Sequence, residues 1–80
     1  MMMILDQEKK MIVNIDMSTA VCTNSKKDGN QIWATEPGEK GGVFILGEYQ
    51  TRERAEEVLQ EIFEKMKTTG FDFTYEMPKE

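Results

Sequence analysis

The chain has 80 residues, with 15 acidic and 10 basic side chains that give a net charge of −5. This acidic balance lacks the basic footprint of a general nucleic-acid-binding protein. A single cysteine excludes an internal disulfide, and the absence of histidine excludes zinc sites of the usual Cys/His spacing. We expect one small domain over residues 1–80 whose core is marginal, and therefore a homo-oligomer.

The first half of the chain predicts strands joined by short turns. Residues 2–5 are apolar and residues 11–16 alternate apolar with polar, which predicts an antiparallel hairpin. Residues 19–24 are rich in β-forming side chains, which predicts a third strand. Asp28 and Gly29 predict a turn that leads into a fourth strand over residues 31–35.

A strand over residues 43–50 follows a glycine-rich loop and leads almost directly into an amphipathic helix over about 51–69. The strand is apolar on both faces, which is typical of a central strand or of one between a helix and a second subunit. Thr51 is a candidate N-cap and Gly70 a candidate helix end. The helix has one apolar stripe of period 3.6, made of Ala55, Val58, Leu59, Ile62, Phe63 and Met66.

The tail over residues 71–80 begins with alternating aromatic and polar side chains. This pattern predicts either a last strand or an arm that lies across another copy. The predicted fold is therefore α+β: a four- to five-stranded antiparallel sheet of β-hairpins, with one long helix on one face and an extended C-terminal tail.

Three stretches of the chain resemble one group of proteins. They are QEKKMIVNI (Gln7–Ile15), LGEYQTRERAEEVLQEI (Leu46–Ile62) and YEMP (Tyr75–Pro78). Their order and spacing resemble the small proteins carried by phages and mobile elements of Firmicutes, with a weaker match over residues 17–42. The resemblance implies a non-enzymatic protein of the bacterial cytoplasm. Small phage proteins of this kind often inhibit host systems, and some are oligomeric sponges that sequester nucleotide immune signals.

The sequence is poorly supplied for catalysis. Histidine, the commonest general base, is absent, so Ser/His and Cys/His pairs cannot form. Cys22 lies in a predicted strand and is interpreted as a small buried residue. Most carboxylates fall on the polar face of the helix, and no cofactor-binding motif is present. We therefore expect no enzyme activity, no catalytic residues, no metal and no cofactor. No apolar run approaches the length of a membrane span, and no export signal is recognised, so we expect a cytoplasmic protein.

Arg52 and Arg54 form the main candidate site. They lie in the first helical turn, where the macrodipole is positive and acidic side chains are preferred. A small anionic ligand or a partner's carboxylate would resolve this conflict, aided by exposed N–H groups. The alternative is that both guanidinium groups are solvated or pair with Glu48, Glu56 or Glu57.

Aromatic side chains could extend this site. A nucleotide base could stack on Tyr49, Trp33 or Tyr75, although so small a domain also needs such side chains for its core or subunit interface. Lys40, beside two glycines, could hold a phosphate or belong to an ordinary loop.

Three functions remain open at this point. The first is an oligomeric sponge that sequesters an anionic, nucleotide-like ligand to counter host defence. The second is an inhibitor that binds a host protein. The third is a structural or regulatory accessory protein of a mobile element.

Overall fold

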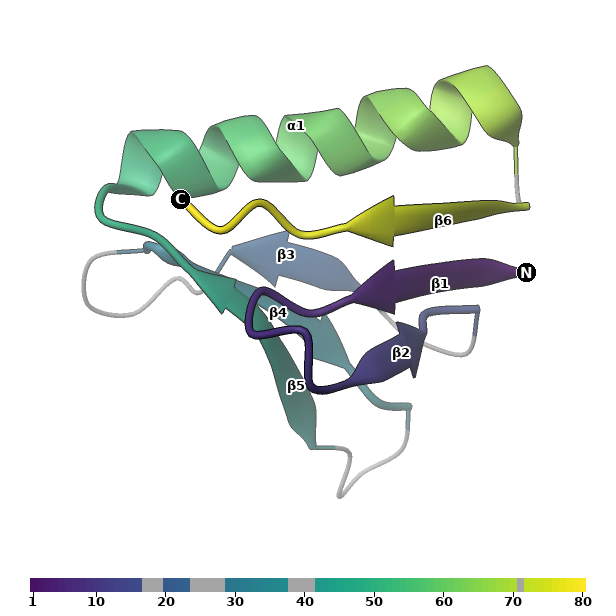
Figure 1. The fold of residues 1–80 in the computed structure, drawn as a ribbon, viewed down its shortest axis with the longest axis horizontal. Coiled ribbons are helices and arrows are strands. Elements are labelled where there is room, and N and C mark those ends of the chain that lie inside the picture. The colour runs from purple at the N-terminus through teal and green to yellow at the C-terminus, as the bar shows by residue number, and fades with distance from the viewer. Residues whose placement is uncertain (17–19, 24–28, 38–41, 71) are drawn as a thin grey trace.

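A computed structural model describes residues 1–16, 20–23, 29–37, 42–70 and 72–80. Within these ranges the chain is α+β, with two three-stranded sheets and one helix (Figure 1). The strand orders are β2-β1-β6 and β3-β4-β5. The elements are β1 (Met2–Leu5), β2 (Ile12–Asn14), β3 (Val21–Thr23), β4 (Gln31–Thr35), β5 (Val43–Glu48), α1 (Arg52–Thr69) and β6 (Phe73–Glu76).

The first sheet joins the two ends of the chain. β1 and β2 form the predicted antiparallel hairpin, and β6 pairs with the other edge of β1 in parallel. Ile4, which is fully buried, lies opposite both Val13 and Tyr75. The tail therefore forms the third strand of this first sheet. Because α1 runs back along the molecule, the chain enters β6 beside the start of β1 and must run parallel to it (Figure 1).

The second sheet is an antiparallel meander of β3, β4 and β5. Trp33 lies opposite Cys22 on one side and Ile45 on the other, with a register shift between Ile32 and Trp33. Two predictions are wrong here. The strands form two sheets with one parallel pair, whereas one antiparallel sheet of four to five strands was expected. β5 lies at a sheet edge, so it is not the central strand that its apolar faces predicted as one alternative. Its Val43 and Ile45 are about half exposed, and cover by a second subunit stays a prediction.

Helix α1 has the predicted position and caps. The Thr51 hydroxyl oxygen accepts the backbone N–H of Arg54 at 3.1 Å. Gly70 has a φ of 73° and donates its N–H to the carbonyl oxygen of Met66 at 2.8 Å, which ends the helix in a conformation that favours glycine. In the part of the chain that the structure describes, no helix combines the length and the apolar character needed to cross a membrane.

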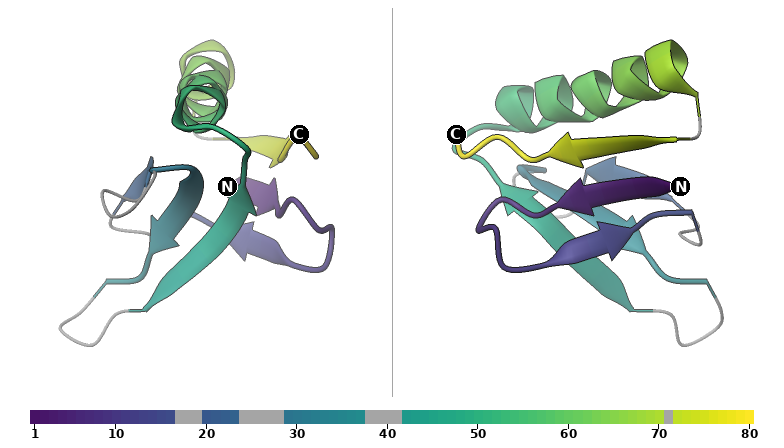
Figure 2. Two further views of the ribbon diagram at one scale, coloured as in Figure 1. Left: turned by 90° about the vertical axis from the view of Figure 1, so that its left-hand side faces the viewer. Right: turned by 45° about the vertical axis from the view of Figure 1, so that its right-hand side comes forward.

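The core lies where α1 meets both sheets (Figure 2). The helix contributes Ala55, Val58 and Ile62, all 2% exposed or less. Burial of each larger aliphatic side chain contributes about 1.5–3 kcal/mol to stability, which is a large part of what so small a domain can gain. The sheets and the C-terminal segment contribute Ile4, Val13, Ile15, Ile32, Ala34, Leu46, Tyr49, Phe73 and Met77.

Gly47 on β5 is required by close packing. A Cβ atom at this position would lie 3.0 Å from the hydroxyl oxygen of Tyr49 and 3.3 Å from the terminal methyl carbon of Met77. Both neighbours are buried, so neither side chain can move aside without disturbing the core.

We predict that Gly47→Ala lowers the free energy of unfolding by about 1–3 kcal/mol, because the added methyl group overpacks the core. The matched control is Gly42→Ala, whose Cβ atom would meet only the carboxylate of Glu36 at 3.9 Å. Urea unfolding followed by Trp33 fluorescence measures both variants. Equal stabilities of the two variants would contradict close packing at Gly47.

Candidate functional site

The joint between β5 and α1 is built around Tyr49. Its backbone N–H donates to the carbonyl oxygen of Asn30 at 2.9 Å, and its hydroxyl donates to the carbonyl oxygen of Pro78 at 2.9 Å. The residue is 3% exposed, so its ring contributes almost nothing to the surface. Tyr49 thus fastens the C-terminal segment to the core.

Arg54 lies over the Tyr49 ring, with its guanidinium carbon 6.0 Å from the ring centroid. Its Nη1 lies 3.2 Å from Glu57 Oε1 and 3.3 Å from Glu61 Oε2, and its Nε donates to the carbonyl oxygen of Glu80 at 3.0 Å. The pairing with Glu57, expected as one alternative, is confirmed. The hydrogen bond that Arg54 donates to Glu57 and the negative charge of Glu61 raise the pKa of the Arg54 guanidinium.

Tyr75 belongs to the same network. Its hydroxyl donates to Glu61 Oε1 at 2.8 Å, so Glu61 joins Tyr75 on β6 to Arg54 on α1. Burial raises the pKa of Tyr49 to about 12, with Arg54 acting in the opposite direction. Burial and the hydrogen bond to Glu61 likewise raise the pKa of Tyr75. Both phenols therefore stay protonated over the physiological pH range.

A hollow of about 250 Å³ opens beside this network. It is lined by residues 48–51, Arg54, Lys79 and Glu80, so two cations and two carboxylates surround it. Arg52 is exposed at the start of α1, about half a helical turn from Arg54, and is not among the residues that line the hollow. The structure therefore brings Tyr49, Arg54 and Tyr75 together, as the candidate site requires.

Trp33 lies apart from these three residues. It is on β4 of the second sheet, and its indole N–H donates to Gln31 Oε1 at 2.9 Å. Its cross-strand neighbour Cys22 is half-buried, whereas a buried side chain was expected. Lys40 lies outside the described residues.

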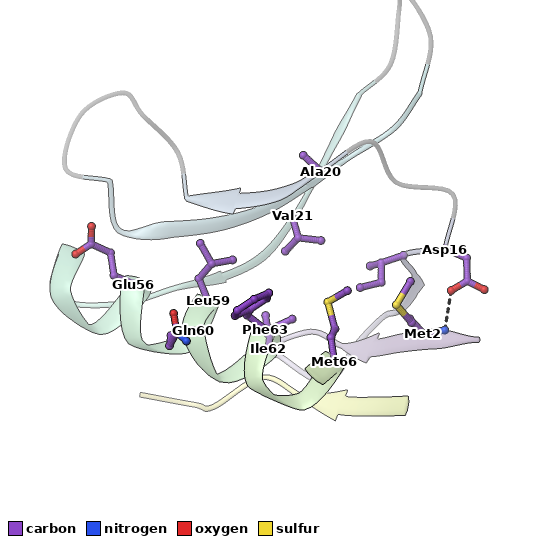
Figure 3. A pocket seen from close by; sticks show the side chains of 11 residues that line it. Met2, Asp16, Ala20, Val21, Glu56, Leu59, Gln60, Ile62, Phe63 and Met66 are labelled. Carbon is purple, nitrogen blue, oxygen red and sulfur yellow. Dashed lines mark hydrogen bonds between the residues drawn. The ribbon is translucent and has the colours of Figure 1, made fainter. Parts of the chain in front are cut away.

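A second hollow, larger than the one at the joint, was not foreseen from the sequence. It is a groove of about 680 Å³ between α1 and β3, open toward the ends of β1 and β2 (Figure 3). Leu59, Phe63 and Met66 form one wall and are called here the exposed ridge after Phe63, since Leu59 and Met66 are half-buried and also pack against the core. Phe63 is 53% exposed. The full lining is Met2, Ile15, Asp16, Ala20, Val21, Glu56, Leu59, Gln60, Ile62, Phe63 and Met66.

The groove is apolar with acidic ends. Its two charged lining residues are Asp16 and Glu56, and Asp16 Oδ1 accepts the backbone N–H of Met2 at 2.7 Å. Lys67 lies beside the exposed ridge, with its ammonium group 5.6 Å from the centroid of the Phe63 ring. The sequence carries no signal that separates the helix positions that line the groove from those that the sheets cover, because both belong to one apolar stripe.

The chain matches no protein-family model, and comparisons with curated proteins and with solved structures also find no match. The residues themselves therefore carry the functional argument.

We predict that stability falls as the pH rises from 10 toward about 12, the pKa of Tyr49 in the folded protein. Between these values the unfolded chain loses the phenol proton that the folded chain keeps, so unfolding becomes more favourable. The protein has two tyrosines, so absorbance at the phenolate band isolates them. Native protein should develop this band about two pH units above urea-unfolded protein, and coincident titrations would contradict the burial of Tyr49.

Proposed function

We propose that this chain is a non-enzymatic protein-interaction module that docks a polypeptide against the exposed ridge and its groove. The observation that carries the proposal is the exposed ridge itself, at which Phe63 keeps 53% of its surface in contact with water. Large apolar side chains that gather around one groove are typical of contact surfaces.

The chemistry of the groove favours a polypeptide over a small anion. The charges among the described lining residues are both negative, which disfavours a phosphate or nucleotide. The exposed ridge has i, i+4, i+7 spacing, the pattern with which one helix packs against another. Met2 and Met66 give the groove side chains that adapt to irregular surfaces.

This function is compatible with the phage-type resemblance. A small protein that blocks a host protein needs a stable scaffold and one apolar contact surface, and does not need catalytic groups. The exposed ridge on a capped, well-packed helix supplies such a surface.

We predict that a photoactivatable benzophenone side chain at position 63 cross-links to a polypeptide in the producing cell. The matched control is the same side chain at Asp72, which is 93% exposed and is not among the residues that line the groove. The mass of the product identifies the partner. Cross-linking at position 63 that does not exceed cross-linking at position 72 would falsify the proposed function.

A second candidate is sequestration of an anionic, nucleotide-like ligand at the joint between β5 and α1. Arg54 over Tyr49, with Lys79 on the same hollow, supports this candidate. Against it, Arg54 already meets two carboxylates and a carbonyl oxygen, so a ligand would have to replace these contacts.

If an anion is sequestered at the joint, we predict that Lys79→Ala weakens binding while the protein stays folded, because the Lys79 side chain lines the hollow and is exposed. Isothermal titration calorimetry with nucleoside monophosphates, nucleoside triphosphates and cyclic dinucleotides provides the measurement. Lys10→Ala, which removes an exposed cation from the β1–β2 turn, is the control. No heat with any of these nucleotides, or equal heats for the wild type and Lys79→Ala, would exclude the joint as an anion site.

A further inference from the structure

We infer that the polypeptide that packs on the exposed ridge is a second copy of this chain, with the two α1 helices antiparallel. The inference rests on the proposed interaction function and names its partner. It is carried by the way charge and apolar surface are arranged along one stripe of α1.

The exposed ridge has an acid near one end and a base near the other. Glu56 lines the groove, and Lys67 lies against the Phe63 ring. These two residues are eleven positions apart on α1, which is about three helical turns, so they lie on the same stripe as Phe63. From its N-terminal to its C-terminal end, the stripe therefore carries an acidic residue, Glu56, then the apolar Phe63, then a basic residue, Lys67.

Such a stripe is complementary to itself in the antiparallel direction. A two-fold axis through the stripe places Glu56 of each copy opposite Lys67 of the other, which makes two ion pairs. In this register, facing residues lie at equal distances from the midpoint between positions 56 and 67. Gln60 of one copy therefore lies opposite Phe63 of the other. The apolar side chains at the centre then lose contact with water.

The current partner of Lys67 does not prevent this arrangement. Its ammonium group lies 3.8 Å from Glu64, and both side chains are more than half exposed. Such a contact contributes little to stability and exchanges readily. Apolar burial would supply most of the affinity, while the two ion pairs select the antiparallel register over the parallel one, in which like charges would meet.

The small size of the chain gives a physical reason for a dimer. A chain of 80 residues has few elements with which to cover α1, and neither a disulfide nor a histidine is present to staple the fold. A second copy covers the part of the helix that the two sheets leave in water.

Sedimentation equilibrium over a concentration series tests the inference through charge reversal. The wild type should dimerise, and Phe63→Asp should be monomeric. Glu56→Lys and Lys67→Glu should each weaken the dimer about tenfold, since each puts two pairs of like charges together. The double variant Glu56→Lys/Lys67→Glu should recover wild-type dimerisation, because the reversed pairs are again complementary.

The controls are Glu8→Lys and Lys10→Glu, the same charge changes on exposed side chains of the β1–β2 turn, which should leave the dimer unchanged. Circular dichroism confirms that each variant is folded. A wild type that stays monomeric at every concentration overturns the dimer, while cross-linking from position 63 to a different protein would leave the proposed function in place. Failure of the double variant to recover overturns the antiparallel register.

Discussion

Helix α1 carries more apolar surface than the two sheets can cover, and both the fold and the proposed function depend on this excess. One side of the stripe, with Ala55, Val58 and Ile62, packs where the sheets meet and holds them together. The other side is the exposed ridge, which lies over an open groove (Figure 3). A helix that only had to close the core would place a polar side chain at position 63. The proposed contact with a second polypeptide would cover the exposed part of the Phe63 ring.

The joint between β5 and α1 plays a different part. Tyr49, Arg54 and Tyr75 share hydrogen bonds and charges with Glu61 and with the carbonyl oxygens of the last residues. These contacts hold the C-terminal segment against the core and allow β6 to complete the first sheet beside β1. The groups that made this joint an attractive anion site are thus already engaged within the chain. A ligand there would gain contacts only by displacing internal ones, at a cost in stability.

Local patterns predicted the elements well. Alternation of apolar and polar side chains predicted the hairpin of β1 and β2. A β-forming run after a turn predicted β4, and the apolar period of 3.6 with caps at Thr51 and Gly70 predicted the helix. All of these signals depend on residues that are close in the sequence. The division into two sheets did not follow. The tail pairs with β1 from the far end of the chain, and nothing in the alternation of residues 71–77 specifies a parallel partner. The apolar faces of β5 wrongly predicted a central position, because apolar side chains on an edge strand have the same sequence pattern as those on a central strand.

The contacts within the candidate site likewise depend on the assembled fold. The sequence identified Arg54 by its unfavourable place at the helix start, and the structure shows carboxylates within reach of it. One of these, Glu61, is two turns away and also accepts a hydrogen bond from the Tyr75 hydroxyl on β6, a contact that no local pattern contains. The groove was missed because apolar stripes are read as core. Whether a stripe is fully covered depends on the width of the sheets, and this is a property of the assembled fold.

The most direct measurement is ¹⁹F NMR with 4-fluorophenylalanine placed only at position 63, recorded as the protein concentration rises from micromolar to millimolar. If the exposed ridge packs against a second copy, the resonance shifts or splits with concentration. A label at Phe73, which is 5% exposed and belongs to the core, stays unchanged. A position-63 resonance with one shift and one linewidth at every concentration would contradict self-association through the exposed ridge.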